Sequence, residues 1–212
     1  MNSDSRTLRH DEPLAIELTA AVKQGEVERL RRLLAAEPGL ARCVVEDAKG
    51  GGRTPLHLFA DWPGHNPNAA TVVHTLHAAG ADIEHEGSSI DGGAPLSSAV
   101  GYGQWAAARR LVERGARTVL WHEAALGLIA AIKRRVEADP PPSPDALSGP
   151  FWNACHGGQL AAAQYLLAHG ADLNWPAPWS GQTPLDIAEK AGRGEVVAWL
   201  REMGAVRGEA SA

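Results

Sequence analysis

Cysteine and the smaller aromatic residues are scarce in this chain of 212 residues, which has two cysteines, two tyrosines and two phenylalanines. Two cysteines, Cys43 and Cys155, exclude a disulfide framework, so we expect a reducing, cytoplasmic environment. The N-terminal segment has no apolar run typical of a signal peptide. No segment approaches the roughly 20 apolar residues of a membrane span, so we expect no membrane partner.

Concentrated positive charge is also missing. Lysine and arginine number 20 against 25 aspartates and glutamates, a net charge of −5. Nucleic-acid binding requires a basic face, so we expect no nucleic-acid partner. Hydrophobic residues at 44% and charged residues at 21% are typical of a folded globular protein. Against this background, seven tryptophans stand out.

A short phrase occurs twice, as GRTPLHLFA at Gly52–Ala60 and as GQTPLDIAE at Gly181–Glu189. Segments that start at Ala94, Gly149 and Thr183 share a frame, with one glycine nine residues after the start and a Gly-Ala pair twelve residues later. The copy that starts at Thr54 carries five extra residues, and two degenerate copies surround Gly25 and Gly127.

Each copy predicts two helices. A Thr-Pro opening favours a helix start, and a glycine ends the first helix. The second helix is amphipathic, and its final glycine favours a left-handed C-cap. A single pair of this size cannot bury its apolar face, whereas stacked pairs share a core. The sequence therefore predicts an all-α solenoid of about six helix-turn-helix repeats.

These segments resemble the ankyrin repeat, whose pattern runs T-P-L-H, then G, then G-A-D over about 33 residues. The resemblance identifies the chain as a stand-alone ankyrin repeat protein, and the Ala- and Arg-rich composition suggests a bacterial source. It implies β-hairpin fingers beside the helices and a concave face that binds partners. The residues that carry the repeat motif are Thr54, Pro55, His57, Gly80, Gly115, Gly170, Thr183 and Pro184.

The frame predicts one ankyrin-repeat domain over residues 12–206, between a mobile N-terminal tail at 1–11 and a C-terminal tail at 207–212. Its approximate repeats are 12–48, 49–90, 91–116, 117–147, 148–180 and 181–206. The connector after Gly115 is nearly absent, which predicts a missing or stunted finger and a weak joint there. The connector Ala138–Gly149 holds four prolines and predicts a stiff, irregular loop.

Exposed aromatic side chains on the concave face would be anchors for a partner, because one ring buries about 150–250 Å². The alternative for each is ordinary packing within an irregular repeat, and we assign Trp105, Trp152 and Trp199 to the core. The acidic connector after Gly80 favours a partly basic partner. The candidate groove residues are Asp61, Trp62, His85, Asp91, Tyr102, Trp121, His122, His156, Trp175 and Trp179.

Other chemistry has weaker support. His74 and His77 lie three residues apart, but no cysteine or carboxylate at ligand spacing joins them, so we expect no metal and no cofactor. Cys155 and His156 are adjacent on a helix and point about 100° apart, which does not make a nucleophile–base pair. Cys155 fits a slot for a small buried residue. We predict no catalytic residues.

Two functions remain open. The first is a non-enzymatic binding module that recognises a protein partner through its groove. The alternative is a groove closed into a pocket that binds, or chemically transforms, a small organic molecule. In that case the acid–base candidates are Asp61, His85, His122 and His156. A closed cavity around Tyr102, Trp121 and His156 would favour the small molecule.

Overall fold

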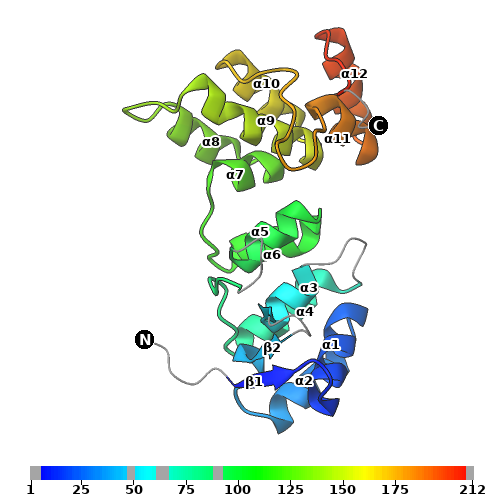
Figure 1. The fold of residues 1–212 in the computed structure, drawn as a ribbon. Coiled ribbons are helices and arrows are strands. Elements are labelled where there is room, and N and C mark those ends of the chain that lie inside the picture. The colour runs from blue at the N-terminus through cyan, green and yellow to red at the C-terminus, as the bar shows by residue number, and fades with distance from the viewer. Residues whose placement is uncertain (1–5, 47–50, 61–66, 88–92, 209–212) are drawn as a thin grey trace. The chain divides into compact units, whose positions relative to one another are not determined.

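The structure is a computed structural model that describes residues 6–46, 51–60, 67–87 and 93–208. Its contacts divide the chain into two compact units, Met1–Arg117 and Thr118–Ala212. We call them the first and the second unit (Figure 1). The division falls just after Gly115, where the sequence predicts a weak joint.

The first unit consists of helix pairs and a small sheet. One row of helices comprises α1 (Pro13–Gln24), α3 (Pro55–Ala60) and α5 (Pro95–Gly101), in which each contacts the next. A second row comprises α2 (Val27–Ala36), α4 (Ala69–Ala78) and α6 (Trp105–Glu113). A 3-10 helix spans Leu40–Arg42. The two rows are the layers expected of stacked helix pairs.

The sheet has three short strands, β1 (Thr7–Arg9), β2 (Val44–Glu46) and β3 (Gly52–Arg53). Strand β2 pairs in parallel with β1 and antiparallel with β3. The sequence predicts a mobile tail up to residue 11, but Leu8 is buried and its neighbours pair with β2. The correction has a simple cause, since one apolar residue in a polar segment suffices to anchor a three-residue strand.

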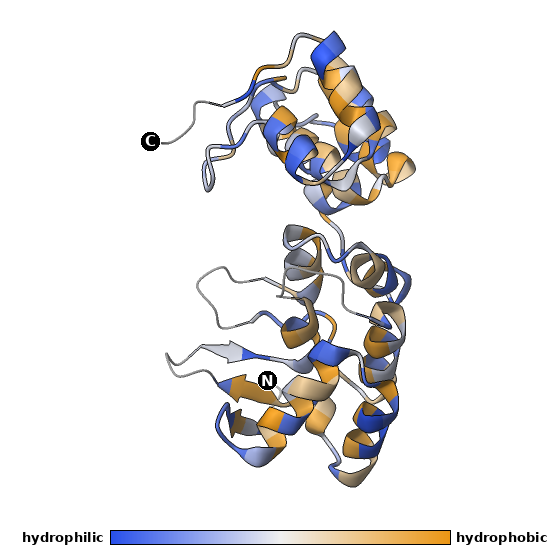
Figure 2. Cartoon of the chain, turned by 90° about the vertical axis from the view of Figure 1, so that its right-hand side faces the viewer, coloured by the Kyte–Doolittle hydropathy of each residue, from blue (hydrophilic) through white to orange (hydrophobic). Residues whose placement is uncertain are grey.

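The second unit has three helix pairs. Helices α7 (Leu120–Leu126) and α11 (Pro184–Lys190) both pack against α9 (Pro144–Gly157). Helices α8 (Ile129–Val136), α10 (Leu160–Ala168) and α12 (Gly194–Glu202) follow their partners in sequence. Each helix carries hydrophobic and hydrophilic residues, and the hydrophobic ones form a core around Phe151 and Leu166 (Figure 2).

The glycines that the frame predicts as helix ends have left-handed backbones. The value of φ is 92°, 96°, 101° and 82° at Gly80, Gly115, Gly170 and Gly204. Gly157 has a different role, because a Cβ there would collide with the carbonyl oxygen of Ala125. Helices α7 and α9 can approach closely only because residue 157 lacks a side chain.

The Thr-Pro openings act as helix starts. The backbone N–H of Asp186 donates to the Thr183 hydroxyl at 3.3 Å, and the N–H of Thr183 donates to the Asp186 carboxylate at 2.8 Å, which closes a capping box. In α3, Thr54 Oγ1 lies 2.8 Å from His57 Nδ1, and His57 Nε2 lies 3.1 Å from the Gly93 carbonyl oxygen. Both motif threonines are buried.

The proline-rich connector is shorter than the sequence predicts. Helix α9 begins at Pro144 rather than near Gly149, so only residues 138–143 form the loop. Ser143 accepts a hydrogen bond from the Ala146 N–H at 3.3 Å, and Pro144 occupies the first helical position, which has no need of an N–H. Leu147 then extends the buried face of the helix.

The C-terminal segment is held as far as Gly208, which the sequence assigns to a tail. Its N–H donates to the Asp186 carboxylate at 2.9 Å, and the Arg207 guanidinium pairs with Glu189. The Val206 N–H donates to the Asn174 side chain at 2.8 Å. These contacts cover the last helix pair of the second unit.

Candidate interaction surface

Three tryptophans of the second unit form one cluster. Trp152 comes from α9, and Trp175 and Trp179 come from the connector between α10 and α11. The ring of Trp179 meets that of Trp152 at 5.5 Å between centroids and 81°, and that of Trp175 at 5.8 Å and 67°. These edge-to-face contacts are favourable pairings of aromatic rings. We refer to Trp152, Trp175 and Trp179 as the tryptophan cluster.

The connector that carries the cluster is folded back on itself. The N–H of Ala177 donates to the carbonyl oxygen of Gln182 at 3.0 Å, and that of Gly181 donates to Ala177 at 2.7 Å. The Trp152 indole N–H donates to the same Gln182 carbonyl at 3.0 Å. Ala177 is fully buried. This connector, which we call the finger, is thus hydrogen-bonded to α9. The tryptophan cluster is therefore already ordered in the chain without a ligand.

The cluster combines a buried base with an open face. Trp152 is 6% exposed, whereas Trp179 is 64% exposed. Trp175 is half-buried. Within the described part of the chain, the indole N–H groups of Trp175 and Trp179 have no hydrogen-bond partner, so both remain available as donors. A large apolar ring held open in this way is the usual form of a binding anchor.

His156 lies beside the cluster, with its ring centroid 5.5 Å from that of Trp152. Burial, aided by the charges of Arg193 and Lys190, lowers the pKa of His156 to about 4. The imidazole is therefore neutral near pH 7 and lies in a positive local potential. Cys155 is fully buried and burial raises the pKa of its thiol, so it is a packing residue.

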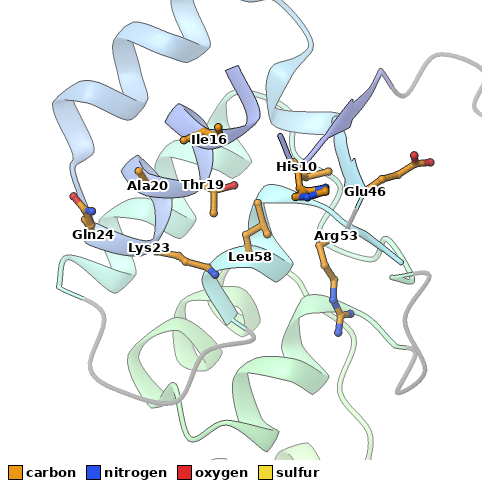
Figure 3. Close-up of a pocket in the computed structure, with 10 residues that line it drawn as sticks. His10, Ile16, Thr19, Ala20, Lys23, Gln24, Glu46, Arg53 and Leu58 are labelled. Atoms are coloured by element: carbon orange, nitrogen blue, oxygen red, sulfur yellow. The ribbon is translucent and has the colours of Figure 1, made fainter. Parts of the chain in front are cut away.

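A cavity of about 450 Å³ lies in the first unit. In Figure 3, side chains of α1 lie on one side, His10, Glu46 and Arg53 lie on the other, and Leu58 of α3 lies between them. Ile16 is an exposed apolar residue on its rim. The cavity mixes apolar side chains with Lys23, Glu46 and Arg53, a composition that suits a small polar molecule or one side chain of a partner.

The candidates that the sequence places in one groove belong to both units. Tyr102 is 43% exposed at the end of α5 in the first unit. Trp121 is half-buried at the start of the second unit, and its ring lies 3.9 Å from that of His122. Asp61, Trp62 and Asp91 lie outside the described residues. The cavity forms around none of Tyr102, Trp121 and His156.

The structure shows how two of the candidate histidines are packed. His122 is 5% exposed, and its Nδ1 accepts a hydrogen bond from the Val119 N–H at 3.3 Å, so it belongs to the interior rather than to a groove. The reason is its place in the first turn of α7, on the face that packs in the unit. His85 is half-buried, and its ring meets that of His57 edge to face at 6.2 Å.

The acidic connector after Gly80 is partly neutralised within the first unit. Glu84 accepts from the Arg117 backbone N–H at 2.7 Å and pairs with the Arg117 side chain at 3.0 Å. Asp82 accepts from the Glu84 N–H at 2.9 Å. The carboxylate of Glu84 is therefore engaged by Arg117, which weakens the expectation of a basic partner there.

The repeat pattern did not predict the buried carboxylate of Glu123. Glu123 occupies the position held by Ala99, Ala154 and Ala188 in other pairs, and its side chain is 3% exposed. It pairs with Arg135 at 2.8 Å and accepts from the Thr118 hydroxyl at 2.7 Å. The sequence did contain a signal for this ion pair: Glu123 stands where other repeats have alanine, and Arg135 follows on the next helix.

The neighbour of His74 in the structure is a cation, the guanidinium of Arg114, which is not a metal ligand. The Arg114 guanidinium contacts the His74 ring, and its charge, together with a smaller burial effect, lowers the pKa of His74. Among the described residues, no group of three or more His, Cys, Asp or Glu side chains is arranged to hold a metal ion. None of the described helices is both long and apolar enough to cross a membrane.

Comparison with known families bears directly on the second unit. The family described as "Ankyrin repeats (3 copies)" matches residues 136–207. This match lies within the second unit. This region includes α9 to α12 and the whole tryptophan cluster. No curated protein matches the chain.

The ankyrin region and the helix pairs of both units fit an all-α repeat fold. Ankyrin repeats are generally protein-interaction modules. The family match covers only part of the second unit, so ankyrin repeats throughout the chain remain a proposal.

Proposed function

We propose that this chain is a non-enzymatic binding module that recognises a protein partner, and that the tryptophan cluster is its principal anchor. The observation that carries the proposal is the 64% exposure of Trp179 in edge-to-face contact with the buried Trp152. A free tryptophan ring on a flexible loop would have to be ordered on binding. Here the finger already holds it, which lowers the cost of association.

The chemistry around the cluster agrees with binding rather than catalysis. His156, whose ring contacts Trp152, is neutral and its pKa of about 4 is too low for a general base that works near pH 7. Cys155 is buried beneath the surface with a raised pKa. The cluster therefore offers apolar area and two indole donors, which are the components of a recognition site.

A capture experiment tests the proposal. Tagged wild-type chain, Trp179→Ala and Ile16→Ala would each be incubated with lysate of the source organism, and retained proteins would be identified by mass spectrometry. Both substitutions remove an exposed apolar side chain, one in each unit. We expect a partner that wild type and Ile16→Ala retain and Trp179→Ala loses. A partner retained equally by all three would refute the assignment of the anchor.

A second function has one observation in its favour, the cavity of about 450 Å³ in the first unit. Its volume falls within the range of small-molecule sites, and its lining combines apolar side chains with Lys23, Arg53 and Glu46. Native mass spectrometry of the gently purified chain tests this alternative. An extra mass lost in Lys23→Ala would support it, and a chain that carries no small molecule under these conditions would count against it.

A further inference from the structure

The second unit also contains an exposed proline-rich loop that the proposed function does not use. It connects α8 to α9 and reads DPPPSP over residues 139–144. Pro140, Pro141 and Pro144 are exposed. Ser143 has φ −65° and ψ 155°, the values of a polyproline II helix, and a residue that precedes proline is held in this region. Pro141 to Pro144 forms a P-x-x-P sequence.

Aromatic surfaces with free indole donors recognise such segments. Proline rings pack flat on indole faces, and the backbone carbonyls of a polyproline II segment accept hydrogen bonds from indole N–H groups. Trp179 supplies the exposed face, and Trp175 and Trp179 supply donors without a partner among the described residues. The segment needs little ordering, since proline already restricts its backbone.

Basic side chains lie beside the cluster and acidic ones beside the loop, and the connector of the cluster also carries the exposed Asp172. Lys190 and Arg193 lie near His156, on which both act to lower the pKa. The loop is flanked by Asp139 and Asp145, both exposed. An acidic, proline-rich segment is therefore attracted to the cluster, which favours encounter and orientation.

A cationic ligand fits less well. A cage for a methylated ammonium needs aromatic walls with space between them. In the cluster, neighbouring rings are already in contact at centroid distances of 5.5 Å and 5.8 Å, and the nearby charges are positive. The geometry leaves flat outer faces rather than an enclosed box.

A loop and cluster of one copy are kept apart. Pro144 and Trp152 belong to the same helix α9, eight residues and about 12 Å of helix rise apart. The loop projects from the end of the second unit that lies away from α11 (Figure 1). The prolines of one copy are thus available to the cluster of another.

We infer that the tryptophan cluster of one copy binds the proline-rich loop, residues 139–144, of a second copy of this chain. The inference rests on the proposed function and names its partner. The contact joins two different surfaces of the chain. In a dimer held by one such contact, one copy still has a free cluster and the other a free loop. Further copies can therefore add to the dimer unless the assembly closes into a ring.

Sedimentation velocity from micromolar to near-millimolar concentration tests the inference. Wild type would be compared with Trp179→Ala and with the double variant Pro141→Ala, Pro142→Ala. The matched controls are Met203→Ala, which removes another exposed side chain of the second unit, and Pro38→Ala, which removes an exposed proline of the first. Circular dichroism would verify that each variant is folded.

We expect the sedimentation coefficient of wild type and of both controls to rise with concentration, and the self-affinity of each cluster or loop variant to fall at least about tenfold. An equimolar mixture of the two variants should associate again, since one retains the cluster and the other retains the loop. This complementation separates a direct contact from a general loss of structure.

Three results would overturn the inference: a wild type that stays monomeric throughout, a Trp179→Ala variant that associates like wild type, or a mixture that does not associate. The proposed function fails separately, when Trp179→Ala still retains every protein that wild type captures. A monomeric wild type whose captured partner depends on Trp179 would leave that function standing and assign the cluster to a different protein.

Discussion

The two units present different surfaces on similar helix pairs. The first unit has a cavity of about 450 Å³ lined by charged and apolar side chains from α1, the sheet and α3. The second has an open cluster of three tryptophans on a finger that is tied to α9. A cavity suits a small group, and an open aromatic face suits a protein segment. The cavity is lined mainly by α1, whereas two of the three clustered tryptophans lie on a connector.

The largest effect that we predict tests whether the second unit is a rigid support. Arg135→Ala would leave Glu123 buried with only the Thr118 hydroxyl, and loss of one partner of a buried ion pair costs about 3 kcal/mol. Urea unfolding followed by tryptophan fluorescence reports mainly this unit, which holds five of the seven tryptophans.

Glu123→Ala is the matched control for that variant. It should cost less, because Arg135 is 45% exposed and water can solvate its charge, and because alanine fills this position in other pairs. Equal losses in the two variants would show that the pair does not support the unit as we describe.

Gly157→Ala should destabilise the second unit by about 1–3 kcal/mol, because the added methyl group collides with the Ala125 carbonyl and forces α7 and α9 apart. Gly194→Ala, at the first residue of α12, meets no atom within 4 Å and should leave stability unchanged or slightly raised. Thermal unfolding of both variants measures the contrast. Equal melting temperatures would contradict the close packing of these helices.

The stability of the second unit should depend on pH through His156. His156 has a pKa of about 4 in the folded chain and about 6.5 when unfolded, so the unfolded chain binds the extra proton between these values. The free energy of unfolding therefore falls as the pH is lowered through this window, by roughly 1–2 kcal/mol between pH 7 and pH 5.

Urea titrations at the two pH values measure this loss, and His156→Gln, which cannot titrate, isolates it. The variant should lose less stability than wild type on acidification. Identical losses would mean that the imidazole is not buried in the positive surroundings that we describe.

The smallest predicted effects concern the exposed anchor Trp179 and its control Ile16. Trp179→Ala and Ile16→Ala should each change stability by no more than about 0.5 kcal/mol, because both side chains are already largely in water. Urea midpoints that match wild type would verify that the capture experiment compares folded surfaces. A large loss in either variant would identify that residue as structural.

Much of the helix frame could be predicted from the sequence. Thr183, Pro184 and the glycines at the helix ends act locally, through caps and left-handed backbones, so their signals lie within a few residues. The early start of α9 was missed because Ser143-Pro144 is a helix start hidden in a proline-rich run. Strand β1 was missed because its partner β2 lies over 30 residues away.

The candidate site was less predictable. Trp175 and Trp179 stood out by composition, but the sequence assigned Trp152 to the core without its contact with Trp179, which depends on how the finger folds back. The burial of His122 depends on which face of α7 packs inward, and its local sequence does not determine that face. The cavity joins residues from three segments, which no local pattern reveals.

Hydroxyl-radical footprinting of the wild-type chain, free and with its captured partner, tests the central claim most directly. It measures the protection of side chains in both units without any substitution. We predict that Trp175 and Trp179 become protected and that Ile16 and Leu58 do not change. Protection of Ile16 and Leu58 with unchanged Trp179 would contradict the account and move the partner site to the first unit.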